Sequence, residues 1–516
     1  DFGPDGVTLH YLTGGRLPGT LKARVATKGE SLGEEALHLM SHDVLTHRTI
    51  DHGAIELLGS KCPPAYVNSL LVGQDGGIYF LTRLPSGQSE LAVVSPTQIW
   101  QRARDKMPSL GELRSSLAHL ICEYESELQE AAVFWCKFGV DGERGGVHCA
   151  LRDDGSLAVG KKVSVFQGRG AWLFSTLGDF RSASGCVSFA KAYCRNRLGS
   201  WYDAVTTEGT PMEGAGSCEW ASVFLAEGLV ALAWAEGGAQ CVSRLQEALQ
   251  LVQDFVARHD DPTLAAPEAY LPILAGDWPP GTRTLARHML PLRVATQALI
   301  GAAEPGIDTA AAAVASGFEP IAKRMRKHIL YDFVARNSTG LCYEALTHEY
   351  RPLGGPVGAL CWLGHAVEAL WFVFDDARRC SDSVDAVVAA RALKQHIEQA
   401  WDKDYGGLFR AWSTQTGFSG YEDKAAWIQQ EALVALAQLA AYGCGGSGDE
   451  AELRDWAASR FLQLQSWCWK SLRLGGGRLW RVGVTRDGCC DASFGFGKLP
   501  TADSPPEPRK EHYHHP

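Results

Sequence analysis

From about residue 113 onward, apolar residues recur three and four positions apart, the spacing expected of amphipathic helices. Clusters of Gly, Pro and Asp separate the helical segments. The pattern predicts helices over 113–138, 166–180, 185–198, 217–236, 240–259, 284–302, 307–330, 357–377, 382–401, 424–443 and 448–471. Successive pairs of helices favour a closed α/α toroid, so we expect an all-α domain over residues 113–516.

Residues 1–112 lack this helical pattern and are rich in Gly, His and Thr. Short apolar runs at 66–71, 77–84 and 90–94 predict strands, and turn residues such as Pro85-Ser86-Gly87 lie between them. We therefore expect a small, irregular, partly β N-terminal extension in front of the helical domain.

A turn pattern recurs between the predicted helices. Asp141 is followed by Gly145-Gly146 and a short apolar segment, and Asp402 is followed by Gly406-Gly407 and a similar segment. The repetition predicts a unit of helix, loop, short strand and helix, in which the two aspartates form turns. In such a toroid the pocket lies where the connecting loops converge.

Charge and composition argue against two classes of protein, those that bind nucleic acids and those that span a membrane. Charged residues make up 21% of the chain and the net charge is −10, without a strong basic block, which argues against a nucleic-acid partner. No run of about 18 apolar residues occurs, which argues against a membrane span; the longest candidate, 221–235, is interrupted by Glu227. The 16 tryptophans suit either a carbohydrate site or a helical core, and the core is the commoner use.

Fifteen scattered cysteines do not form a disulfide pattern, because their number is odd and the chain is long. We expect mostly buried, unreactive thiols in a reducing compartment, either the cytoplasm or an organelle reached after removal of a targeting segment.

Several short motifs resemble the N-acylglucosamine 2-epimerase family, which includes renin-binding proteins, cellobiose 2-epimerases and mannose isomerases. Each motif alone is weak, but their order and spacing agree with the family over residues 120–516. The motifs are Phe134-Trp135 with Asp141 and Gln167-Gly168-Arg169, Gly364-His365-x-x-Glu368, Trp401-Asp402 to Phe409, Lys424-x-x-Trp427 with Glu431-Ala432, and Tyr513-His514-His515-Pro516. Residues 1–112 have no counterpart in the family pattern.

The resemblance implies an (α/α)6 barrel that moves the proton at C2 of an open-chain sugar. Epimerases return this proton to the opposite face of C2, and the isomerases deliver it to C1. The chemistry needs a positioned base and stabilisation of the enolate oxygen, but no cofactor and no metal. The partner implied is a small-molecule sugar.

His365 and His514 are the candidate catalytic pair, because epimerisation needs an acid/base group on each face of a planar intermediate. Imidazole suits this task because its ordinary pKa lies near neutrality. His514 stands in a histidine-rich tail beside His512 and His515, so the register of this motif is open.

Five further residues are candidates for sugar binding. Glu368 lies three residues after His365 and so shares its helix face, and Arg169 is a permanent donor suited to a carbonyl oxygen. Glu431 interrupts an apolar helix and needs a partner, which is a sugar hydroxyl, a histidine or Lys424. The resemblance adds Lys424 and Trp427 to this group.

The chain also departs from the family pattern. Trp362-Leu363 stands where relatives have Asn-Pro, and Ala426 and Ile428 replace a Trp and a Pro. The first choice is interconversion of N-acyl-D-glucosamine and N-acyl-D-mannosamine. The alternatives are a mannose-type aldose–ketose isomerase and a non-catalytic scaffold, with a glycosidase using Glu368 and Glu431 ranked last. The unmatched extension is a candidate surface for a homodimer or a larger assembly.

Overall fold

The computed structural model describes 14 segments of the chain, and we call them the described residues. They are 8–14, 37–43, 48–54, 67–72, 78–83, 89–94, 110–152, 154–212, 216–264, 278–334, 340–417, 422–443, 449–474 and 480–488. The chain divides into two compact units. The first contains Asp1–Glu127, Lys403–Gly406 and Gln465–Lys470, and the second contains Leu128–Asp402, Gly407–Leu464 and Ser471–Pro516.

The first unit contains two antiparallel three-stranded sheets. One consists of β1 (Thr8–Gly14), β2 (Leu37–Asp43) and β3 (Arg48–Ala54), and the other of β4 (Val67–Val72), β5 (Ile78–Arg83) and β6 (Ser89–Val94). The second sheet confirms the three strands predicted from the sequence. The first sheet was not predicted, because its strands carry Gly, His and Asp and lack a clear apolar alternation.

The sheet of β4, β5 and β6 has two different faces. Ile78 and Phe80 on β5 are buried, while Leu81 and its cross-strand partner Leu91 are 46% and 67% exposed. Strand alternation places the two pairs on opposite faces of the sheet. The expected assembly through this extension stays a prediction.

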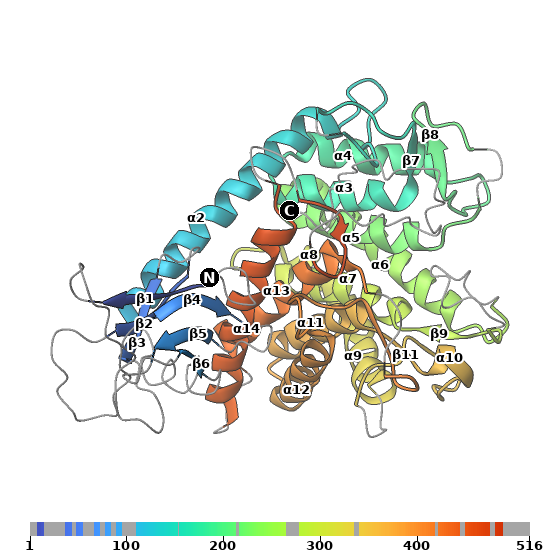
Figure 1. Ribbon diagram of the computed structural model, residues 1–516. Helices are drawn as coiled ribbons and strands as arrows, with labels where there is room; N and C mark the ends of the chain where they lie inside the picture. Colours follow the sequence, from blue (N-terminus) through green and yellow to red (C-terminus); the bar gives the residue numbers. More distant parts are fainter. Residues whose placement is uncertain are drawn as a thin grey trace. The chain divides into compact units, whose positions relative to one another are not determined.

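The second unit is a helical toroid with an inner layer of helices that contact one another in chain order (Figure 1). The contacts run from the first to the last helix of the series α3 (Ser164–Thr176), α5 (Trp220–Glu236), α7 (Ala286–Ala302), α11 (Leu363–Arg379) and α13 (Ala426–Tyr442). This order is the one expected when a single layer of helices surrounds a common axis.

Helices that alternate with the inner series along the chain pack against it from outside. Thus α4 (Phe180–Phe189) packs on α3, α6 (Cys241–His259) on α5, α9 (Glu319–His328) on α7, and α12 (Ser383–Ala400) on α11. The remaining helices are α2 (Leu110–Phe134), α8 (Thr309–Ala315), α10 (Gly355–Gly358) and α14 (Asp449–Ser471). The alternation confirms the predicted α/α toroid with a small, partly β extension.

Four inner helices each begin directly after a short strand. The strands β7 (Lys161–Val163), β9 (Arg283–Thr284), β11 (Leu360–Trp362) and β13 (Lys424–Ala425) precede α3, α7, α11 and α13. They pair antiparallel with β8 (Ala204–Thr206), β10 (Ala345–Leu346), β12 (Ala411–Ser413) and β14 (Gly483–Val484). The repeated unit of loop, short strand and helix is therefore present, and it fixes where each inner helix starts.

One predicted helix is divided. The single helix expected over 307–330 consists of α8, a 3-10 turn at Ser316–Phe318, and α9. A Cβ on Gly317 would lie 2.6 Å from Leu249 Cδ2, so a larger residue here would displace the Leu249 side chain. Pro320 then occupies the first turn of α9, where its missing N–H has no cost.

Several cysteines are buried, as expected. Burial raises the pKa of Cys149 to about 12 and that of Cys194 to about 11, which keeps both thiols protonated.

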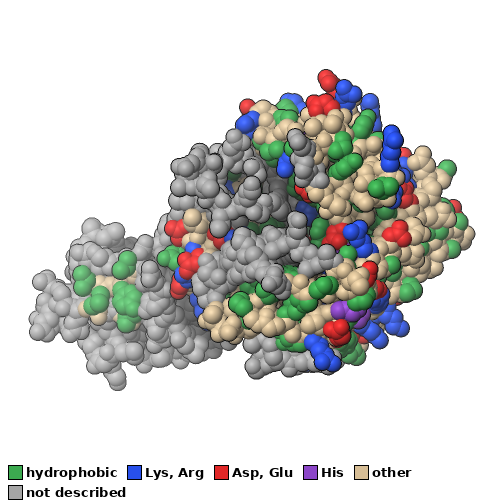
Figure 2. Space-filling model, turned by 90° about the vertical axis from the view of Figure 1, so that its right-hand side faces the viewer, with side chains coloured by type: hydrophobic (Ala, Val, Ile, Leu, Met, Phe, Trp, Pro, Cys, Tyr) green, Lys and Arg blue, Asp and Glu red, His purple; other side chains and the backbone are tan. Residues whose placement is uncertain are grey.

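On the face shown in Figure 2, the described acidic and basic side chains are interspersed. Within the described residues, no helix is long and apolar enough to cross a membrane.

Candidate active site

Each of the five inner helices contributes one charged side chain to a group that we call the charged girdle. The girdle consists of Arg169 on α3, Glu227 on α5, Arg293 on α7, Glu368 on α11 and Glu431 on α13. All four other members act electrostatically on Glu368. Segments up to about 260 positions apart in sequence therefore place their charges together inside the ring.

Glu368 is a buried carboxyl group of the girdle whose pKa is raised. Its side chain is only 5% exposed. Burial, followed by the negative charge of Glu431, raises the pKa of Glu368 well above its ordinary value, although Arg169 acts in the opposite direction. A carboxyl group in this environment holds its proton at higher pH and can serve as a proton donor.

His365 lies one turn above Glu368 on the same helix and is oriented by a buried carboxylate. Its Nδ1 is 3.0 Å from Oε1 of Glu344, whose side chain is fully buried, while His365 itself is 17% exposed. Since a carboxylate oxygen accepts, Nδ1 carries the hydrogen and Nε2 is the basic nitrogen of the ring. This is the arrangement that a general base requires.

Glu344 was not among the residues expected from the sequence. It ends the segment Leu341-Cys342-Tyr343, directly before β10, where apolar neighbours surround it on both sides. A lone carboxylate in such a segment signals a buried partner, but only the fold shows that this partner is His365.

Close helix packing brings aromatic rings to the same place. A Cβ on Gly364 would lie 2.4 Å from Cη2 of Trp427, so the glycine permits α11 to approach α13. The ring centroids of His365 and Trp427 are 5.8 Å apart. Trp371, two turns along α11 from His365, donates a hydrogen bond of 2.7 Å from Nε1 to Oε2 of Glu431.

Arg169 is positioned in a similar way. Gly168 packs against α5 so closely that a Cβ would lie 2.3 Å from the carbonyl carbon of Phe224. The Arg169 guanidinium consequently lies over the Phe224 ring, 4.4 Å from its centroid. Arg169, His365, Glu368, Trp427 and Glu431 thus gather in one region, and their roles at a sugar site stay a prediction.

Lys424 has a different environment from the other predicted binding residues. Its side chain is fully buried, and Nζ lies 3.0 Å from Oδ2 of Asp402. Burial lowers the pKa of Lys424, and the hydrogen bond to Asp402 opposes this effect. The ion pair anchors the strand β13 to the turn that begins at Asp402.

A second buried Lys–Asp ion pair occurs at the equivalent turn that begins at Asp141. Lys162 is fully buried, and its Nζ lies 2.7 Å from Oδ2 of Asp141. A glutamine five residues after each lysine then holds the backbone beyond the double glycine, with Gln167 bonded to N and O of Val147 and Gln429 to N and O of Leu408. The two turns are therefore structurally equivalent.

We expect Lys424→Met to destabilise the protein by about 3 kcal/mol, because it leaves the Asp402 carboxylate buried with a weaker set of partners. Lys162→Met should have a similar effect at Asp141. Chemical denaturation of both variants measures the change. If Lys424→Met kept full stability and instead raised KM for a sugar, Lys424 would be a substrate ligand.

The predicted catalytic His514 lies outside the described residues, as do His512 and His515. The structure therefore says nothing of the second histidine motif.

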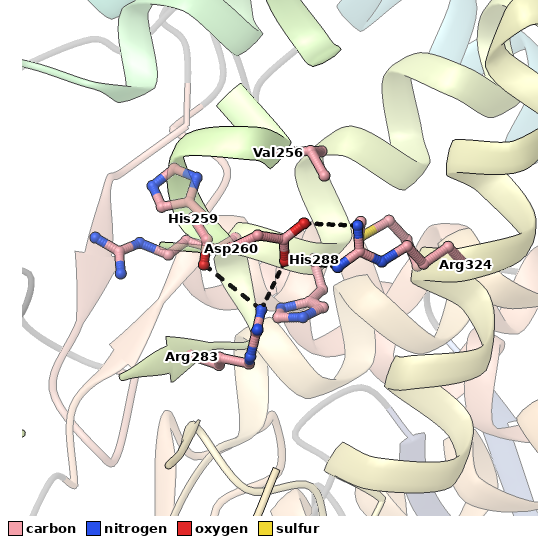
Figure 3. Close-up of a pocket in the computed structure, with 8 residues that line it drawn as sticks. Val256, His259, Asp260, Arg283, His288 and Arg324 are labelled. Atoms are coloured by element: carbon pink, nitrogen blue, oxygen red, sulfur yellow. Dashed lines mark hydrogen bonds and ion pairs between the residues drawn. The ribbon is translucent and has the colours of Figure 1, made fainter. Parts of the chain in front are cut away.

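A separate small hollow lies among α6, β9, α7 and α9 (Figure 3). At its centre Asp260 receives hydrogen bonds from Arg324, at 2.6 and 2.7 Å, and from Arg283, at 3.1 Å. Burial lowers the pKa of His288 to about 3, so this histidine is neutral. Arg283, Arg287 and Arg324 line the hollow together with Asp260, and none of the predicted site residues lines it. Among the described residues, no three His, Cys, Asp or Glu side chains are placed to hold a metal ion.

Comparison with known families supports the motif assignment. Residues 145–493 match the family model of N-acylglucosamine 2-epimerase (GlcNAc 2-epimerase). A sequence search of curated proteins found no match.

Solved structures with similar folds include three sugar isomerases or epimerases. A D-mannose isomerase shows 15% identity and a TM-score of 0.58, with 76% of this chain and 94% of that chain covered. The cellobiose 2-epimerase from Bacillus thermoamylovorans B4167 shows 15% identity and a TM-score of 0.58, covering 77% and 97%. The corresponding enzyme from Spirochaeta thermophila DSM 6192 shows 17% identity and a TM-score of 0.58, covering 79% and 96%. At these identities the likeness shows the fold, an (α/α)6 toroid.

Proposed function

Because the chain belongs to the N-acylglucosamine 2-epimerase family, we propose that it is a sugar 2-epimerase that acts on N-acyl-D-glucosamine and N-acyl-D-mannosamine. The observation that carries this proposal is the His365–Glu344 pair, whose imidazole lies one helical turn from the buried Glu368. A base and a proton donor then stand together, as proton transfer next to a carbonyl group requires.

In the proposed reaction, Nε2 of His365 removes the proton from C2 of the open-chain aldose. The electron pair of the C–H bond forms a carbon–carbon double bond with C1, and the carbonyl oxygen gains a proton from Glu368. Arg169 stabilises the charge that develops on this oxygen. In the second half of the reaction the enol O–H returns its proton to Glu368, the C=O bond re-forms, and the electron pair of the C=C bond takes a proton on the opposite face of C2, which gives the epimer.

His514 is the proposed donor on that opposite face, on the strength of the Tyr513-His514-x-Pro516 motif alone. In the same proposal Trp427 and Trp371 present apolar rings to the sugar, and Glu431, held by Trp371, accepts a hydrogen bond from a sugar hydroxyl.

A mannose-type isomerase is the alternative within the same chemistry, because it uses the same base and delivers the proton to C1. The similar fold of a solved D-mannose isomerase supports this alternative. A scaffold without activity is the alternative of a different class, motivated by the departures near Trp362 and Ala426.

The test is incubation of the purified chain with a panel of N-acylhexosamines, hexoses and β-1,4-linked disaccharides, followed by identification of products by NMR. A C2 epimer of an N-acylhexosamine supports the proposal. A ketose product identifies an isomerase instead. No product with any sugar, from a chain that remains folded, favours the scaffold.

A further inference from the structure

Two members of the charged girdle, Glu227 and Arg293, have no role in the chemistry proposed above. Glu227 is 2% exposed and stands on α5 among apolar residues. Its Oε1 lies 3.6 Å from Nε of Arg293 on α7, which is 19% exposed. Burying an ion pair inside a helical ring costs free energy unless further contacts stabilise the two charges. The further contacts of the Glu227–Arg293 pair therefore indicate its role.

Arg293 makes specific contacts on its other sides. Its guanidinium carbon lies 5.0 Å from the centroid of the Trp371 ring and 5.3 Å from that of Phe372. With the side-chain amide of Gln297 turned so that its oxygen faces Arg293, that oxygen accepts hydrogen bonds from Nε at 3.1 Å and Nη2 at 2.8 Å. The guanidinium is therefore fixed in place against Trp371.

Trp371 connects this pair to the proposed active site. While its ring contacts Arg293, its Nε1 donates to Glu431 at 2.7 Å. The contacts thus run from Glu227 through Arg293 and Trp371 to Glu431, across α5, α7, α11 and α13. Trp371 therefore links the Arg293 guanidinium to the Glu431 carboxylate.

The pair also acts on Glu368 through its charges. The groups that face Glu368 are Arg169 from α3, Glu227 from α5, Arg293 from α7 and Glu431 from α13, with His365 one turn away on its own helix. With every member ionised, the girdle would contain three negative and two positive charges. One proton on Glu368 brings the net charge of the girdle to zero.

We propose that the Glu227–Arg293 pair is a positioning device for the proton transfer: it orients Trp371 on Glu431 and balances the charge around Glu368. The inference rests on the proposed function for its catalytic consequence. Glu227 and Arg293 are positioning residues, since they act through Trp371, Glu431 and Glu368.

The opposite charges of the pair make a distinctive prediction. Glu227→Gln removes a negative charge near Glu368 and makes its proton easier to lose, so activity should decline at a lower pH than in the wild type. Arg293→Met removes a positive charge, so activity should persist to a higher pH. We expect each variant to lower kcat/KM by about ten- to a hundredfold, because Trp371 and Glu431 lose their alignment. The double variant should restore the wild-type pH midpoint.

The chain contains a matched control. Glu219, directly before α5, pairs at 2.8 Å with Arg287 on α7, so a second Glu–Arg pair joins the same two helices. Neither residue is among the groups that act on Glu368. Glu219→Gln should therefore weaken the link between the helices without moving the pH midpoint.

A readout that needs no turnover separates this inference from the proposed function. The carbonyl stretch of protonated Glu368, identified in the infrared spectrum by its loss in Glu368→Gln, is followed against pH. The band should vanish at lower pH in Glu227→Gln and at higher pH in Arg293→Met. Shifts in the same direction, no shifts, or an equal shift in Glu219→Gln would overturn the inference. Opposite shifts without sugar turnover would support the positioning device and refute the epimerase proposal.

Discussion

His365→Ala is expected to lower sugar turnover at least about 100-fold while the protein stays folded. The imidazole is the proposed base, and a positioned base of this kind contributes about 10²–10⁴ to the rate. The ring is partly exposed, but its removal leaves the buried Glu344 carboxylate with a weaker set of partners, so we expect some loss of stability as well. Steady-state kinetics on the substrate identified by the sugar panel, with thermal unfolding of the same sample, measure both effects.

His328→Ala provides the matched control. His328 is also a partly exposed histidine paired with a carboxylate, at 2.8 Å from Asp332, but it lies on the outer helix α9. Its removal should leave turnover unchanged. Equal losses in the two variants would point to a general structural effect and contradict the catalytic assignment of His365.

The same assay decides the register of the second histidine motif. His514→Ala should abolish net epimerisation, because no group then returns the proton to the opposite face of C2. Full activity in His514→Ala together with loss in His512→Ala or His515→Ala would move the role to that neighbour.

Glu368→Gln is the second substitution with a large expected effect. The amide has nearly the shape of the carboxyl group but has no proton to transfer, so we expect kcat to fall by about 10²-fold or more. Substrate affinity should change much less, because hydrogen bonding to the sugar is kept. Comparison of kcat with KM for the two proteins tests this, and an unchanged kcat would remove Glu368 from the chemistry.

The same substitution should change how stability depends on pH. The pKa of Glu368 is raised in the folded state, so between its ordinary value and the raised value the folded protein binds more protons than the unfolded one. The contribution of this group to stability is therefore lost as pH rises across that window. Glu368→Gln lacks the titration, so relative to the wild type it should gain stability as pH rises. Urea unfolding at several pH values measures this gain, and a pH-independent difference would contradict the assignment.

The helical part of the fold was predictable because its apolar spacing repeats with little interruption. The predicted limits of α6, 240–259, differ from the observed Cys241–His259 by one residue. The helix predictions fail where contacts between distant segments determine the local backbone conformation. A 3-10 turn at Ser316–Phe318 divides a predicted helix, and Gly317 in this turn lies close to Leu249, about 70 positions earlier in the sequence.

The site was predictable only where a family motif marks it. Arg169, His365 and Glu368 stand in such motifs, and the structure gathers them with Trp427 and Glu431. Sequence reasoning did not find Glu344 or Arg293, because the sequence does not show which distant residue a buried charged group contacts.

Lys424 shows the opposite difficulty, since it stands in a motif and yet is fully buried beside Asp402. Motif membership alone does not separate a residue that supports the site from one that contacts substrate.

We propose that the site around His365 exchanges the proton at C2 of a sugar. Incubation of N-acyl-D-mannosamine with the wild-type protein in D2O, followed by mass spectrometry and NMR of the recovered sugars, tests it directly. We expect one deuterium at C2 of the epimer formed by the wild type, and no epimer after incubation with His365→Ala. Epimer formed without deuterium at C2, or the same incorporation with His365→Ala, would contradict the account.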